Sequence, residues 1–400
     1  METVKVKEEL LSAILVICAI IFVPLIEKPW AGGALVAIFA LVLYYYFGSF
    51  ATQASLIALS ALYGLSLLPM PLYLTTLAIV MSGDLIFRLT GARLRSYVYA
   101  IIAMVISSYL VFLYIGEISA LTVLFGINVA ILLKTILQGR RDALIIETFG
   151  VALTLYLFHQ IDYKADISLI VLAVLIAFGF SYFSFRAKTA DISGLFSGAL
   201  IGIILIIFTD ARWFLIMLVF FILGSAATRY RYDWKEKKGI EQAHGGARGY
   251  KNVFANGIVA AIAALLYGIT YRPEFIALYI GSISTAAADT LASEIGVTGN
   301  SPFLITTLKQ VPRGTNGGVT WIGEFSAALG GLAIAIVSYA LGLIDTETAV
   351  ICAVAGIFGT NLDSFIGATL ENKGIIGNAG TNLIATFGGG LFAFIFTYLL

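Results

Sequence analysis

Acidic and hydroxyl side chains gather at two places in the second half of the chain, each at the end of an apolar run. The first group runs from Asp289 through Glu294 to Gly296, and the second begins at Asp363. Carboxylate oxygens are hard ligands, the kind with which proteins hold Mg²⁺ against substrate phosphates. We therefore predict that Asp289, Glu294 and Asp363 contact Mg²⁺ and act in catalysis. The alternative is that these acids are simply hydrated at a loop edge.

The spacing of the first group sets a condition. In a continuous helix, residues five positions apart point about 140° away from each other. Asp289 and Glu294 could therefore share a metal ion only if the helix unwinds near Gly296.

A loop rich in basic, hydroxyl and glycine residues follows at 309–320. It lacks the P-loop pattern, yet glycine and asparagine readily adopt backbone conformations that present N–H groups to an anion. We expect Lys309 and Arg313 to bind phosphate, with Lys309 also acting in catalysis. The expected anion nest comprises Gly314, Thr315, Asn316, Gly317, Gly318 and Thr320.

The longest polar segment, residues 229–251, adds further cations. An arginine guanidinium can bind two phosphate oxygens at once, and the start of a helix offers unpaired backbone N–H groups. We therefore predict that Arg229, Arg248 and Asn256 bind phosphate. Attraction to lipid headgroups would by itself also account for positive charge in such a loop.

The elements that must position these residues are membrane-spanning helices. Apolar residues make up 60% of the 400 residues and charged residues only 12%, well below the share in soluble domains. The chain should therefore be an all-α, polytopic transmembrane helical bundle of about 15 spans, within a range of roughly 13 to 17. The net charge of +1 gives no reason to expect a nucleic-acid partner.

The distribution of charge predicts the orientation in the bilayer. Each basic segment follows an even-numbered predicted span, at residues 88–95, 134–141, 186–188, 229–251 and 309–313. By the positive-inside rule, the N-terminus and all the polar segments described above should then be cytoplasmic. One composite site on that side is the simplest interpretation.

The two halves of the chain differ in composition. Of the 40 glycines, 29 lie in residues 181–400, where they would let helices or ligands approach closely. We expect residues 1–165 to form a transmembrane region of unknown role and residues 166–400 to form the catalytic domain. In the first region, Asp84 stands four residues before Arg88, which predicts an ion pair at a helix end and no catalytic role.

At these motifs the chain resembles the family that includes phytyl-phosphate kinase of the plant vitamin E pathway and the eukaryotic transmembrane protein 19. The resemblance covers roughly residues 187–400. The motifs that carry it are Gly224–Arg229, Arg248 with Asn256-Gly257, Asp289–Gly296, Pro312–Thr320 and Asp363–Thr369. It implies nucleotide-dependent transfer of phosphate to an isoprenoid monophosphate, with a more distant kinship to dolichol and phytol kinases and CDP-diacylglycerol synthase.

The function expected from residues and resemblance together is that of a membrane kinase. It would convert an isoprenoid (prenyl or phytyl) monophosphate to the diphosphate, with CTP or another nucleoside triphosphate as co-substrate and Mg²⁺ as cofactor. A cytidylyltransferase that forms a CDP-lipid would use similar residues but release diphosphate. A lipid or ion transporter is the alternative from a different class, although its polar residues would be expected near the bilayer midplane.

Overall fold

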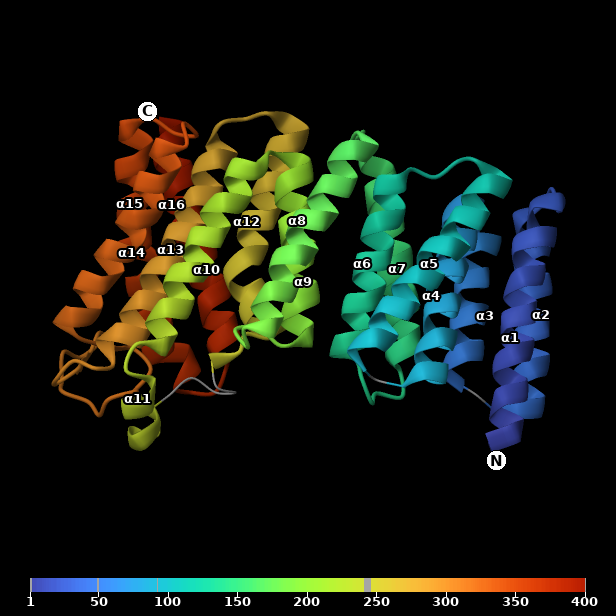
Figure 1. Ribbon diagram of the computed structural model, residues 1–400, viewed down its shortest axis with the longest axis horizontal. Helices are drawn as coiled ribbons and strands as arrows, with labels where there is room; N and C mark the ends of the chain where they lie inside the picture. The colour runs from blue at the N-terminus through green and yellow to red at the C-terminus, as the bar shows by residue number, and fades with distance from the viewer. Residues whose placement is uncertain (1, 49, 92, 241–245, 400) are drawn as a thin grey trace. The chain divides into compact units, whose positions relative to one another are not determined.

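The computed structural model describes residues 2–48, 50–91, 93–240 and 246–399 (Figure 1). Contacts divide the chain into two compact units, Met1–Ser168 and Leu169–Leu400, called unit 1 and unit 2 below. Unit 1 contains α1 (Glu2–Phe22), the 3₁₀ turn η1 (Val23–Leu25), α2 (Pro29–Phe47), α3 (Phe50–Gly64), α4 (Met70–Thr90), α5 (Leu94–Ile115), α6 (Ala120–Ile136) and α7 (Ala143–Ile161).

Unit 2 contains the elements that carry the motifs. Its helices are α8 (Ile167–Arg186), α9 (Ile192–Phe208), α10 (Ala211–Arg229), the short α11 (Tyr232–Lys238), α12 (Tyr250–Thr270), α13 (Glu274–Gly296), α14 (Trp321–Ala340), α15 (Thr346–Ile366) with a π-helical turn η3 (Gly367–Glu371), and α16 (Asn378–Leu399). Two short strands, β1 (Phe303–Leu304) and β2 (Gly318–Val319), pair in antiparallel fashion between α13 and α14.

The apolar helices account for the membrane character of the chain. Eleven helices in the described ranges are long and apolar enough to cross a membrane, and four shorter apolar helices accompany them. The predicted all-α, polytopic transmembrane architecture is confirmed. Local signals set the helix ends: Pro29 begins α2 at a position that needs no N–H donor, and Gly48 ends the same helix in the left-handed conformation.

Charged side chains inside unit 1 bind one another. Asp84 pairs with Arg88 at 2.6 Å, so the ion pair predicted from their spacing is present. Lys134 of α6 extends this pair, because its ammonium lies 3.4 Å from Asp84 and 2.8 Å from Glu147 of α7. The four side chains form a buried or half-buried network of two cations and two anions.

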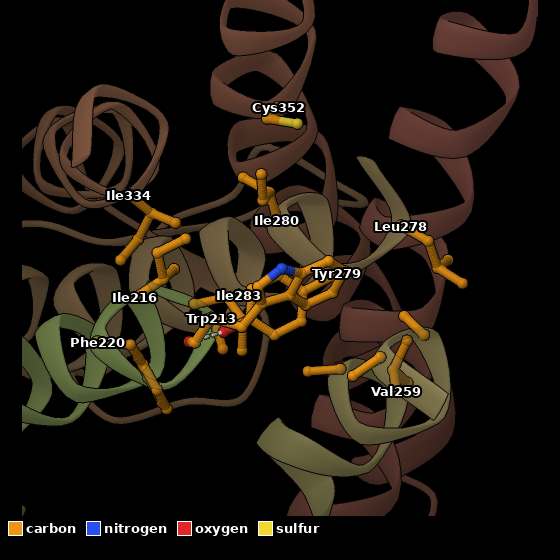
Figure 2. Close-up of a cluster of buried hydrophobic side chains, with 14 of the residues drawn as sticks. Trp213, Ile216, Phe220, Val259, Leu278, Tyr279, Ile280, Ile283, Ile334 and Cys352 are labelled. Atoms are coloured by element: carbon orange, nitrogen blue, oxygen red, sulfur yellow. Dashed lines mark hydrogen bonds between the residues drawn. The ribbon is translucent and has the colours of Figure 1, made fainter. Parts of the chain in front are cut away.

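The core of unit 2 is built around α13, which packs against α10, α12, α14, α15 and α16. Figure 2 shows buried side chains of this core, in which the Tyr279 hydroxyl donates a hydrogen bond to the carbonyl of Trp213 at 2.5 Å. Glycines bring the helix backbones close together: a Cβ at Gly330 of α14 would lie 2.8 Å from the carbonyl oxygen of Ala287. This tight packing holds Asp289, two residues further along α13, in a well-defined place.

Candidate active site

Most of the site residues predicted from the sequence line one cavity, at the end of unit 2 where Figure 1 shows the loop between α13 and α14. This polar cavity has a volume of about 230 Å³. Twelve of the fourteen predicted site residues line it: Arg248, Asn256, Asp289, Glu294, Arg313, Gly314, Thr315, Asn316, Gly317, Gly318, Thr320 and Asp363. Their presence in one cavity does not by itself assign their roles, which stay predictions.

Asp289 of α13 and Asp363 of α15 both line the cavity. The two carboxyl groups are near enough to act electrostatically on each other. Glu371, at the end of η3, is near enough to act electrostatically on both. In the part of the chain that the structure describes, neither aspartate forms a salt bridge, and the Oδ1 atom of Asp363 is buried without a hydrogen-bond partner. Carboxylates gathered in this way repel, and a bound cation relieves the repulsion.

Glu294 has a different partner from the one predicted. Helix α13 continues without interruption to Gly296, so the condition for a metal shared by Asp289 and Glu294 is not met. The Glu294 carboxylate instead accepts a 2.5 Å hydrogen bond from the ammonium of Lys235, which is 1% exposed. Lys235 also donates to the carbonyls of Ala227 and Thr228 at the end of α10. The Lys235 interaction neutralises Glu294 in the cavity wall, so the structure gives no support for a metal shared with Asp289, and the assignment of Glu294 as a metal ligand stays a prediction.

The glycine-rich loop folds as a nest against the end of α15. Gly314 and Gly317 have φ values of 79° and 78°, which other residues rarely adopt. A Cβ at Gly317 would lie 2.5 Å from both Ala368 Cβ and the Ser364 carbonyl oxygen, so only glycine fits there. Within the described residues, no protein acceptor binds the N–H groups of Gly314, Asn316 and Gly317. These three amides are available to an anion.

Other members of the predicted nest are engaged in holding the loop. The Thr320 hydroxyl caps α14 by accepting from the Gly323 amide at 3.0 Å, and it donates to the Gly296 carbonyl. The Thr315 hydroxyl donates to the Pro312 carbonyl at 2.7 Å, and the Gly318 amide donates to the Thr315 carbonyl. Their side chains and amides therefore shape the nest.

Two arginines bring positive charge to the cavity. The guanidinium of Arg313 stacks over the ring of Trp234 at 5.5 Å and donates to the side chain of Asn300. Arg248 is 6% exposed and lies over the rings of Phe220 and Phe221. Burial lowers the pKa of Arg248 to about 10 while Glu294 acts in the opposite direction, so Arg248 is charged at neutral pH.

The close approach of α10 explains how Arg248 fits. A Cβ at Gly224 would lie 2.4 Å from the Arg248 Nη2 atom. In the described part of the chain, which omits residues 49, 92 and 241–245, no hydrogen bond joins the Arg248 guanidinium to a protein acceptor. Its N–H groups are free for a ligand. Asn256 lies beside it with its Nδ2 bonded to the Asn252 carbonyl at 2.9 Å and its buried Oδ1 unpartnered.

Two predicted cations lie elsewhere. Arg229 is exposed and donates to the Ala187 carbonyl at 3.0 Å. Lys309 is exposed at the turn between the two strands, where its carbonyl accepts from the Leu304 amide at 2.9 Å. Neither lines the polar cavity, and their assignment as phosphate-binding residues stays a prediction.

The structure also adds carboxylates to the cavity. Glu324 follows the Thr320 cap by one helical turn and accepts from Asn361 at 3.1 Å. Glu371 accepts from Thr381 at 3.2 Å. The position of Glu324, four residues after Thr320, could have identified it in the sequence as a cavity residue. Nothing in the sequence distinguishes Lys235, the partner of Glu294, from the other lysines of its segment.

The donor set fits Mg²⁺ held jointly with phosphate. No group of three or more His, Cys, Asp and Glu side chains in the described residues is arranged to hold a metal by itself. Mg²⁺ typically needs only one or two protein carboxylates, because water and substrate phosphates complete its six ligands. Asp289 and Asp363 are the two carboxylates that suit this role.

Comparison with known proteins identifies the family. Residues 175–390 match the model of the integral membrane protein family DUF92, which is more than half of the chain. The chain belongs to this family. The matched region contains every lining residue of the polar cavity, from Arg248 to Asn382. The resemblance drawn from the motifs is confirmed at the level of the family.

Several known proteins are similar to this chain in sequence. An uncharacterised membrane protein of Synechocystis sp. is 41% identical, over 43% of this chain and 69% of that protein. One of Methanocaldococcus jannaschii is 36% identical, over 52% of this chain and 85% of that protein. The chloroplastic protein VTE6 of Arabidopsis thaliana is 30% identical, over 45% of this chain and 56% of VTE6. No solved structure matches the chain.

Proposed function

We propose that this protein is a membrane kinase that transfers a phosphoryl group from a nucleoside triphosphate, CTP or another, to an isoprenoid monophosphate. The observation that carries the proposal is the polar cavity itself. Two carboxylates without a cation partner, Asp289 and Asp363, share it with two guanidinium groups and with the unpaired amides of the glycine-rich loop. This combination suits phosphates bound together with a divalent cation.

The reaction needs little acid–base chemistry from the protein. An oxygen of the lipid monophosphate attacks the γ-phosphorus, the bond from that phosphorus to the β–γ bridging oxygen breaks, and the nucleoside diphosphate leaves with the electron pair. Because a phosphate oxygen is already a competent nucleophile, positioning and charge neutralisation should supply most of the catalysis. This suits a cavity in which no histidine is found among the lining residues that the structure describes.

The residues divide into three roles in this proposal. Arg248 and Arg313 bind phosphate oxygens, and the amides of Gly314, Asn316 and Gly317 orient one phosphate by hydrogen bonds. Asp289 and Asp363 would hold Mg²⁺, which when bound neutralises charge on the transferring phosphate.

The lipid part of the proposal draws on the family. The motifs resemble those of the group that includes phytyl-phosphate kinase, and a chloroplast relative is among the similar proteins. The membrane helices around the cavity are consistent with a substrate that arrives from the bilayer. The positive-inside rule favours a cytoplasmic cavity, where nucleotides and Mg²⁺ are abundant.

Product analysis tests this function. Purified protein in lipid nanodiscs would be incubated with Mg²⁺, a prenyl monophosphate and each γ-labelled nucleoside triphosphate in turn. The expected products are labelled prenyl diphosphate and unlabelled nucleoside diphosphate. Formation of a CDP-lipid with release of free diphosphate would show that the protein is a cytidylyltransferase and not a kinase. Movement of lipid or ions without nucleotide consumption would show that it is a transporter.

A further inference from the structure

A second, apolar cavity adjoins the polar one within unit 2. It has a volume of about 80 Å³ and lies among α8, α9, α10 and α12. Side chains such as Phe214, Met217 and Val253 form its walls. Its lining is therefore suited to hydrocarbon and offers little for reading a nucleotide base.

Glycines open this apolar cavity along α9. Gly194, Gly198 and Gly202 line it at intervals of one helical turn, on a single face of the helix. A Cβ at Gly198 would meet only the Ser181 hydroxyl within 4 Å, at 3.4 Å, so space remains beside this residue. Gly198 therefore leaves a notch in the cavity wall, whereas Gly194 packs closely against the Arg248 carbonyl and Gly202 against Ala177 and Phe214.

The two cavities meet at three residues, because Arg248, Asn252 and Asn256 line both. The Arg248 guanidinium lies 5.5 Å and 5.3 Å from the ring centres of Phe220 and Phe221, which belong to the apolar wall. The buried Oδ1 of Asn256 lacks a partner at the same boundary. A ligand that spans both cavities would place a charged group beside Arg248 and a hydrocarbon group beside the two rings.

We propose that the apolar cavity binds the part of the isoprenoid chain nearest to the phosphate, while Arg248 binds that phosphate. This proposal rests on the proposed function and gives its lipid substrate a location. One narrow cavity suits a single chain. A diacyl phospholipid would bring two chains, for which a cavity of about 80 Å³ is too small.

Filling the cavity tests the proposal. Gly198→Leu adds a side chain where the backbone tolerates it, and Gly179→Leu is the matched control, since Gly179 is exposed on α8 with no atom within 4 Å of its Cβ. The kcat/KM for geranylgeranyl monophosphate should fall about tenfold in Gly198→Leu, because the added side chain occupies the space of the isoprene unit nearest to the phosphate. The kcat/KM should not change in Gly179→Leu. A kcat/KM equal to that of the parent in both variants would overturn the proposal and leave the kinase intact.

A binding measurement separates this proposal from the kinase activity. The unaltered protein would be photolabelled with a diazirine-bearing prenyl monophosphate without nucleotide, and the adducts mapped by mass spectrometry. We expect adducts at cavity residues such as Ile201, Met217 and Val253, displaced by geranylgeranyl monophosphate but not by dioleoyl phosphatidic acid. Adducts confined to other helices, or equal displacement by phosphatidic acid, would reject the assigned chain site. Specific labelling without turnover would reject the kinase and retain the site.

Discussion

In unit 1, charged side chains inside the helices bind one another: Lys134 contacts both Glu147 and Asp84, and Asp84 also binds Arg88. In unit 2, Asp289 and Asp363 line one cavity and form no salt bridge among the described residues. An ionised group inside a membrane protein is costly unless a counter-charge or water compensates it. The comparison therefore indicates a structural network in unit 1 and, in unit 2, a site whose counter-charge arrives with the ligand.

The largest expected effect comes from breaking the network of unit 1. Lys134→Met should lower the free energy of unfolding by about 3–5 kcal/mol, because Glu147 is left buried without its cation. Unfolding in detergent with a graded denaturant measures this. The exposed Lys309→Met is the control and should change stability little. A Lys134 variant as stable as the parent, with phosphoryl transfer lost, would reverse the comparison and place a functional site in unit 1.

The next effect tests the unpaired carboxylates of unit 2. Asp289→Asn keeps the size of the side chain but removes its charge, so phosphoryl transfer should fall about a hundredfold or more, or roughly 3 kcal/mol. Stability should hold, since the substitution removes repulsion with Asp363. Initial rates and unfolding curves for the same preparation separate the two effects. Parent rates from a folded variant would remove Asp289 from the site.

Glu294→Gln sharpens the distinction between a ligand and a structural residue. Its carboxylate already binds Lys235, so the substitution should disturb the cavity wall and slow transfer roughly tenfold. The Mg²⁺ concentration for half-maximal rate should stay the same, whereas in Asp289→Asn it should rise. A Mg²⁺ titration of both variants makes the comparison, and a rise in Glu294→Gln would identify Glu294 as a metal ligand.

The sequence predicted much of this site because its motifs stand at helix ends. In a bundle of membrane-spanning helices with short loops, the helix ends lie on only two sides, so motifs on the same side are close together. Asp289, Asp363 and the glycine-rich loop were identified on those grounds and do line one cavity. The partner of Glu294 depends on α11 folding back against the end of α10, a tertiary contact without a local signal. The position of Lys309 depends likewise on a backbone hydrogen bond to Leu304 of β1, and the residue does not line the cavity.

Separating the two units tests whether unit 1 matters for catalysis. A chain that begins at residue 166 retains every residue of the polar and apolar cavities, so it should keep most of the transfer activity. Its rate would be compared with that of the full chain in the same nanodiscs, after circular dichroism has shown a helical fold. A folded but inactive unit 2 would show that the catalytic domain extends into residues 1–165.

The smallest effect is expected where the sequence pointed to a cation that the structure places outside the cavity. Lys309→Met should change the KM for nucleotide and lipid by no more than about twofold, as for other exposed substitutions. Arg313→Met is the matched comparison from the same loop, and there the loss of a charged donor should raise a KM about tenfold. Steady-state kinetics at saturating Mg²⁺ give both values. A large effect at Lys309 would mean that the loop rearranges when substrate binds, because only such a movement could bring its ammonium to the phosphates.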